Sequence, residues 1–132
     1  MRHLIASALL AALAATAAAQ QASRPRVELA CQPTDIALTY LCTVSVADSA
    51  GQPINGVTVT LSADMPSMPM THNVAPVKAQ PVPGQTGSYQ GRLVLEMTGE
   101  WVIRLRFEAP RPDVVVRRLD FQKDKVLAVV PR

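Results

Sequence analysis

Apolar and polar residues alternate along several short stretches of this chain, and no stretch of ten residues keeps the three-and-four spacing of an amphipathic helix. Strict alternation places successive side chains on opposite faces, which is typical of a half-buried β-strand. The pattern predicts strands over residues 27–33, 38–46, 57–61, 89–97 and 101–107, a strand of mixed pattern over 113–121, and a short edge strand or frayed tail over 126–130.

Turn-forming residues separate these stretches. The segment 48–55 carries glycine and proline, residues 84–87 form another turn, and Pro110 and Pro112 end the strand before them. Residues 98–100 have the length of a hairpin connection. The segment 72–83 contains three prolines, which cannot donate to a ladder, so it is predicted to be an edge strand or an irregular connection.

About seven short strands in one domain of this size predict an all-β fold, an antiparallel immunoglobulin-like β-sandwich. True immunoglobulin domains place a tryptophan between their two cysteines, whereas Trp101 follows both. The pattern therefore indicates the architecture and not that family.

The first residues have the form of an export signal. A cationic start, an apolar run from Leu4 to about residue 15 and the pattern Ala17-Ala18-Ala19 predict a signal peptide over residues 1–19. The remaining residues, 20–132, are then one exported, periplasmic domain. An uncleaved membrane anchor is the alternative, and it would be the protein's own contact with a membrane.

Charge and motifs exclude several function classes. The formal net charge is +3, of which Arg2 contributes one, and this is too little to predict a nucleic-acid surface. Beyond residue 3 the chain has a single histidine, His72, and the sequence contains neither a G-x-S-x-G motif nor a P-loop. We therefore expect a protein that is not an enzyme.

Both cysteines, Cys31 and Cys42, fall on the apolar faces of their strands. In an exported protein such a pair favours a buried cross-strand disulfide. The alternative is a thiolate metal or redox pair, although the spacing matches neither C-x-x-C nor a common zinc pattern.

The segment 64–73, DMPSMPMTHN, carries the candidate chemistry. Prolines follow Met65 and Met68 and exclude a helix. If the segment is extended, Met68, Met70 and His72 share one side. Two thioethers and an imidazole are ligands that Cu(I) prefers to harder ions. The alternative is that the methionines fill gaps at the open end of the sandwich.

Four residues have two interpretations each. Met97, at a predicted strand end, is either a further ligand or the last core residue of its strand. Trp101 is either a core anchor or a ring stacked over a bound cation. His72 is either a ligand or a surface residue, and Asp64 is either a turn residue or a ligand for a harder ion.

The segments ADMPSMPMTHN and PGQTGSYQGRLVLEMTGEWVIRLRF resemble the FixH and YtkA-like domains of bacteria. The hallmarks of that family are a methionine-proline-methionine and histidine loop, then a G-x-Y strand and a G-x-W strand. The resemblance covers about 57–107. It implies a β-sandwich associated with copper handling and with assembly of cation pumps and oxidases, with metal ligands at the positions matching its loop. These positions are Met65, Met68, Met70 and His72, with Met97 also in the pattern.

Two functions follow as hypotheses. The first is a periplasmic, non-catalytic Cu(I)-binding protein that exchanges copper with a partner in copper efflux or oxidase assembly. The second is a structural interaction module of a membrane cation-pump or oxidase-assembly complex, in which the methionines form an adaptable apolar contact surface without binding metal.

Overall fold

The computed structural model describes residues 24–68 and 74–130, which form nine strands and no helix. The predicted signal segment, Met70 and His72 lie outside the described residues. The strands are β1 (Arg26–Pro33), β2 (Thr39–Ala47), β3 (Thr58–Asp64), β4 (Val77–Lys78), β5 (Gln80–Pro81), β6 (Ser88–Val94), β7 (Gly99–Ala109), β8 (Asp113–Phe121) and β9 (Val126–Ala128). A helix able to cross a membrane does not occur in these two ranges.

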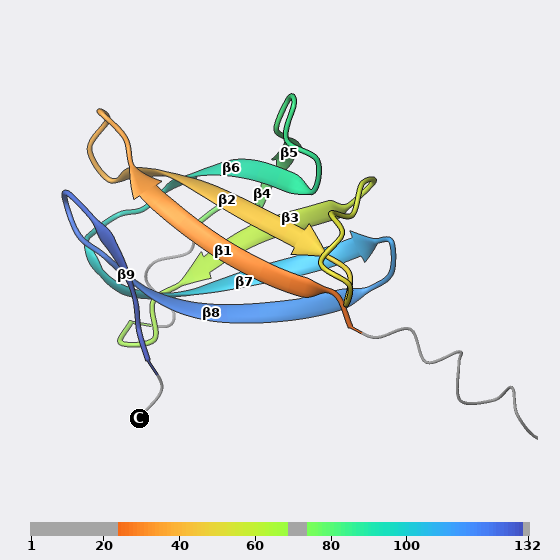
Figure 1. The fold of residues 1–132 in the computed structure, drawn as a ribbon. Helices are drawn as coiled ribbons and strands as arrows, with labels where there is room; N and C mark the ends of the chain where they lie inside the picture. Colours follow the sequence, from red (N-terminus) through yellow and green to blue (C-terminus); the bar gives the residue numbers. More distant parts are fainter. Residues whose placement is uncertain (1–23, 69–73, 131–132) are drawn as a thin grey trace, which may run out of the picture.

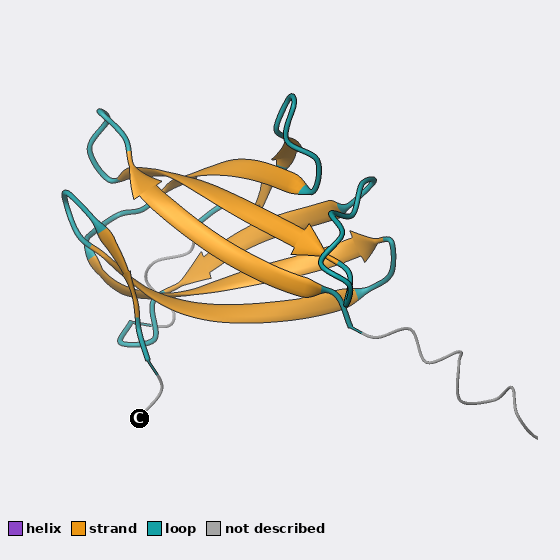
Figure 2. Ribbon diagram, viewed as in Figure 1, coloured by secondary structure: helices purple, strands orange, loops and turns teal. Residues whose placement is uncertain are grey.

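Two antiparallel sheets pack face to face as a sandwich (Figures 1 and 2). The first sheet has four strands in the order β1-β2-β6-β5, and the second has five in the order β4-β3-β7-β8-β9. The predicted all-β sandwich is therefore confirmed.

The short strands β4 and β5 account for the difference between the seven predicted strands and the nine in the described ranges. Both lie within the proline-rich segment. Strand β4 is an edge of the five-stranded sheet, and β5 is an edge of the four-stranded sheet. Between them, the Ala79 amide donates to the Val59 carbonyl at 2.9 Å. Of the two alternatives predicted for this segment, the edge strand is the one observed at 77–78 and 80–81, and the chain crosses from one sheet to the other here.

The prediction of a hairpin at 98–100 is wrong. Strand β6 ends at Val94, and β6 and β7 belong to different sheets, so residues 95–98 connect the two layers. The Leu95 amide donates to the Leu38 carbonyl at 2.9 Å, which keeps the start of the connection against the β1–β2 turn. Alternation in two successive strands is equally compatible with a hairpin and with such a crossing, and only the packing distinguishes them.

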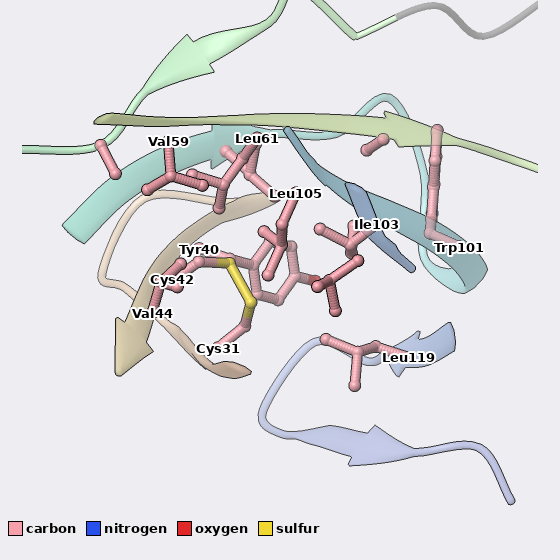
Figure 3. Close-up of a cluster of buried hydrophobic side chains, with 14 of the residues drawn as sticks. Cys31, Tyr40, Cys42, Val44, Val59, Leu61, Trp101, Ile103, Leu105 and Leu119 are labelled. Atoms are coloured by element: carbon pink, nitrogen blue, oxygen red, sulfur yellow. A yellow bond between two sulfur atoms is a disulfide. The ribbon is translucent and has the colours of Figure 1, made fainter. Parts of the chain in front are cut away.

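The core lies between the inner faces of the sheets (Figure 3). Its largest fully buried side chains are those of Trp101, Tyr40 and Phe121. The rings of Tyr40 and Phe121 meet edge to face with centroids 4.8 Å apart, a favoured geometry that joins the two sheets. Burial raises the pKa of the Tyr40 phenol, whose hydroxyl donates to the Gln122 carbonyl at 2.8 Å.

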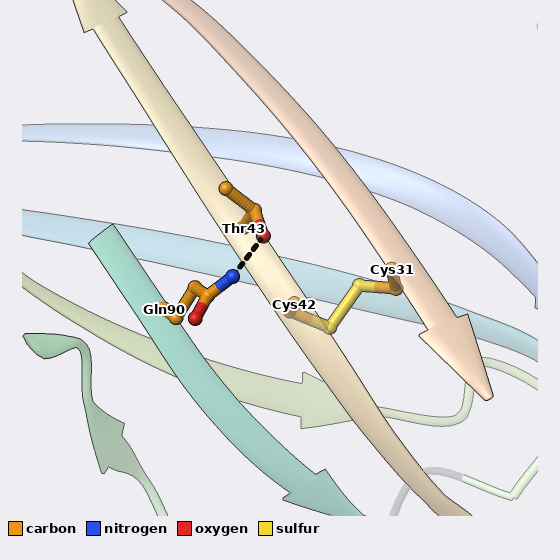
Figure 4. Close-up of a disulfide and its surroundings, with 4 residues drawn as sticks. All are labelled: Cys31, Cys42, Thr43 and Gln90. Carbon is orange, nitrogen blue, oxygen red and sulfur yellow. Dashed lines mark hydrogen bonds between the residues drawn. A yellow bond between two sulfur atoms is a disulfide. The ribbon is translucent and has the colours of Figure 1, made fainter. Parts of the chain in front are cut away.

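A disulfide joins Cys31 of β1 to Cys42 of β2, so the predicted cross-strand bridge is confirmed (Figure 4). The two residues are direct partners in the register, with Cα atoms 4.0 Å apart, and both side chains are buried. On the outer face of the same sheet, the side-chain amide of Gln90 donates a hydrogen bond to the Thr43 hydroxyl at 3.1 Å. The bridge therefore fastens the edge strand β1 to the sheet from the core side.

Replacing both cysteines by alanine should lower the free energy of unfolding by about 3 kcal/mol, because the bridge closes a loop of sequence separation 11 in the unfolded chain. Urea denaturation of the parent and the double variant measures this difference. Alkylation without prior reduction should label neither cysteine of the parent, and labelling of both would show that the bridge does not form in solution.

Candidate functional site

Met65 extends the inner face of β3 beyond the end of that strand. Every second residue before it, at positions 59, 61 and 63, faces the core, and the Met65 side chain is only 5 % exposed. The Met65 side chain is therefore part of the core and not of an exposed loop. It packs into the core at this end of the sandwich, as predicted by the interpretation in which the methionines fill gaps there.

The chain turns sharply directly after Met65. The Met68 amide donates to the Met65 carbonyl at 3.0 Å, which closes a β-turn with Pro66 at its second position. Proline favours that position because its ring fixes φ near −65°. Residues 65–68 are thus not extended, and Met68 is 42 % exposed at the outside of the turn.

The turn contacts the first residue of β7, directly after the connection from β6. Gly99 has a φ of +129°, and a Cβ at this position would lie 3.2 Å from the Met65 methyl carbon. Only glycine adopts this backbone conformation readily and leaves this space free. The methionine turn therefore packs against the start of β7, two residues after Met97.

Met97 lies in this connection and not at the end of a strand, which corrects the sequence-based expectation. Its side chain is partly buried against the core, and its carbonyl accepts a hydrogen bond from the indole N–H of Trp101 at 3.1 Å. Trp101 itself is fully buried, as the core-anchor interpretation predicts. The tryptophan thereby positions the backbone that carries Met97.

We call Met65, Met68 and Met97 the methionine rim. Asp64 points to the opposite face from Met65 and forms an exposed ion pair with Arg104, with Oδ2 and Nη1 3.0 Å apart. It is the last residue of β3 and not a turn residue. Its carboxylate therefore points away from the rim.

In the two described ranges, no three histidine, cysteine, aspartate or glutamate side chains are grouped so that they could hold a metal ion. The candidate ligands are of another kind, namely the thioethers of the rim together with Met70 and His72. The structure brings Met65 into contact with Gly99, two residues from Met97, and places Met68 on the exposed side of the same turn.

Gly99 is the residue of this region whose role sequence reasoning missed. It is the glycine of the G-x-W pattern, two positions before a buried tryptophan. A glycine that close to a core aromatic signals a tight backbone approach. The partner in that approach, Met65, is 34 positions earlier in the chain and could not be inferred from spacing.

The fold and the rim define a class of small β-sandwich domains with a methionine-bearing turn at one end. A comparison with known protein families matches residues 24–106 to the family described as YtkA-like. The match covers more than half of the chain, so the protein belongs to the YtkA-like family, and the resemblance inferred from its motifs is confirmed in this respect. The matched range also includes both cysteines, which lie outside the stretch 57–107. No curated protein and no solved structure matches the chain.

Replacing Gly99 by alanine should destabilise the domain by about 1–3 kcal/mol, because alanine is strained at this φ and its Cβ presses on the Met65 methyl group. Gly84→Ala is the matched control, since Gly84 also has a positive φ, +74°, but nothing lies within 4 Å of its added Cβ. Urea denaturation should show a larger loss for Gly99→Ala. Equal losses in the two variants would mean that the Met65 contact contributes nothing.

Proposed function

We propose that this protein is a periplasmic, non-catalytic copper-binding protein that holds Cu(I) through methionine thioethers and His72. The ligands are Met65, Met68, Met70, His72 and Met97, and the partner is a component of copper efflux or of oxidase assembly. The observation that carries the proposal is the contact between Met65 and Gly99, which brings two methionine-bearing segments distant in sequence to one end of the fold.

The chemistry of these side chains supports Cu(I) over other ions. Thioethers are soft ligands that bind Cu(I), whereas zinc, calcium and magnesium prefer imidazole, thiolate or oxygen. The two cysteines do not compete as ligands, because their sulfurs are joined in the disulfide. Copper binding would therefore rest on the thioethers and one imidazole.

The different exposure of the rim methionines suits a protein that passes its metal on. Met65 is almost fully buried and Met97 is partly buried, so both are held by packing, whereas Met68 is exposed. A partner can approach the exposed thioether first and replace it while the buried ligands still hold the ion. A disulfide-bonded domain is in turn consistent with an oxidising compartment such as the periplasm.

Met68→Leu and Met70→Leu should each weaken Cu(I) binding at least about tenfold, since even the loss of an outer-shell partner typically costs 10–100-fold. Leucine keeps the apolar volume and removes only the sulfur. Competition of the Cu(I)-loaded protein against a chromophoric Cu(I) chelator, under reducing and anaerobic conditions that leave the disulfide intact, measures the affinity. Thermal unfolding of each variant without copper provides the control for folding.

The same titration separates this proposal from the alternative of a metal-free interaction module. The exposed Met68 favours that alternative, because an exposed thioether is an adaptable apolar contact. If both leucine variants hold copper as tightly as the parent, the thioether assignment is wrong. If the parent itself does not compete with the chelator, the interaction module is the better interpretation.

Copper affinity should fall on acidification from about pH 7 to pH 5, because a histidine ligand must be neutral and an ordinary histidine has a pKa of about 6.5. Thioethers do not titrate in this range and remain available. The chelator competition, repeated across this range with a correction for the chelator's own protonation, should show a pH dependence in the parent that is absent in His72→Ala. A dependence that persists in the variant would exclude His72 as its source.

A further inference from the structure

On one side of the sandwich, the five-stranded sheet extends one strand further than the four-stranded sheet. Strand β1 is the edge of the four-stranded sheet there, whereas β9 continues the other sheet beyond β8 (Figure 1). A hollow of about 700 Å³ lies on this side, lined among others by Val27 and Leu29 of β1, Leu119 of β8 and Ala128 of β9. Among the described residues, no strand of the four-stranded sheet lies next to β1 at the place where the opposite sheet has β9.

The outer edge of β1 carries unused backbone hydrogen-bonding groups. The Cα separation of 4.0 Å between Cys31 and Cys42 marks a non-hydrogen-bonded pair of the antiparallel ladder. In such a pair, the backbone N–H and C=O groups of each residue point away from the partner strand. By alternation, the same holds for Val27 and Leu29. In the described part of the chain, the outward N–H and C=O groups of Leu29 and Cys31 have no hydrogen-bond partner.

The neighbouring edge of β8 is closed by comparison. Its outward carbonyls each accept a hydrogen bond, Val114 from Arg24, Val116 from Arg117 and Arg118 from the Val129 amide. Arg117 also donates to the Val27 carbonyl at 3.2 Å and so bridges the open side between the sheets. Between residues 28 and 32, the edge of β1 therefore keeps both its outward N–H groups and its outward carbonyls open for pairing, whereas the outward carbonyls of β8 are occupied.

Arg117 gives the hollow a charge preference. Three other arginines are paired with carboxylates, Arg24 with Asp113, Arg104 with Asp64 and Arg118 with Glu100. The guanidinium of Arg117 is exposed and, among the described residues, donates only to two backbone carbonyls. Glu28 also lines the hollow, but it belongs to the opposite face of β1 from Val27 and Leu29. A carboxylate from outside would give Arg117 a stronger, charge-assisted partner.

We propose that the edge of β1 accepts an extended segment of a partner protein as a fifth strand of the four-stranded sheet. The segment hydrogen-bonds to the backbone of Leu29 and Cys31, places aliphatic side chains into the hollow over Leu119 and Ala128, and sets a carboxylate against Arg117. Pro25 and Pro33 lack an N–H and limit the pairing to about five residues. This inference does not depend on copper binding.

The test uses the peptide acetyl-Thr-Val-Thr-Val-Thr-Asp-Thr-amide as the probe and the whole mature protein labelled with ¹⁵N. Titration to millimolar peptide should shift the amide signals of Leu29 and Cys31 and slow their hydrogen exchange at least several-fold. The same peptide with asparagine in place of aspartate should bind more weakly, on the order of tenfold, because it offers no charge to Arg117. Arg117→Gln should remove this difference between the two peptides.

Two variants of one position isolate backbone pairing from side-chain packing. Leu29→Pro removes the outward N–H and leaves the ladder with β2, whereas Leu29→Ala shortens the side chain and keeps the N–H. Binding should be lost in the first and retained in weakened form in the second. The proposal is overturned if the probe leaves the Leu29 and Cys31 amides unprotected, or if Leu29→Pro binds as the parent does. Protection that rises with protein concentration without peptide would identify a second copy of this chain as the occupant instead.

Discussion

A buried aromatic side chain with a polar atom must find a hydrogen-bond partner, and the arrangement of the connections in this domain depends on that requirement. Each of three core aromatics bonds to the backbone of a connection: Tyr40 to the Gln122 carbonyl, Tyr89 to the Ile54 carbonyl and Trp101 to the Met97 carbonyl. The Tyr89 hydroxyl also accepts from the Val57 amide. In the described ranges no buried side-chain polar atom lacks a partner. An unmet group of this kind costs about 1–3 kcal/mol, so the core itself holds the connections in place.

Much of the fold could be predicted because strands and disulfide depend on local alternation. The apolar face predicted for 38–46 corresponds, from Tyr40 onward, to the buried face of β2, with Cys42 on it, whereas Leu38 precedes the strand. The crossing between β6 and β7 could not be predicted in this way, because a short connection with a glycine fits either a hairpin or a change of sheet. The outcome depends on Trp101 and Leu38, which fasten the connection from opposite layers. Of these two contacts, the one with Leu38 joins segments that are distant in sequence, and spacing along the chain does not reveal it.

The candidate site was predictable in its composition and only partly in its geometry. Proline after Met65 does exclude a helix, but here it also promotes a turn, which separates a buried Met65 from an exposed Met68. The inward direction of Met65 follows from the alternation of β3, which the sequence pattern ended at residue 61, three residues before the strand ends. The positions of Met70 and His72 lie outside the described residues and stay predictions.

The disulfide fixes which backbone groups β1 presents at its free edge. Slippage of a strand by one residue would exchange its two faces and also exchange the backbone groups that point outward. Cys31 and Cys42 are direct partners joined by a covalent bond, so β1 cannot move along β2 without breaking it. The bond acts as a pin for the register, and the same amides and carbonyls remain at the free margin of the sheet for as long as the two sulfurs stay oxidised.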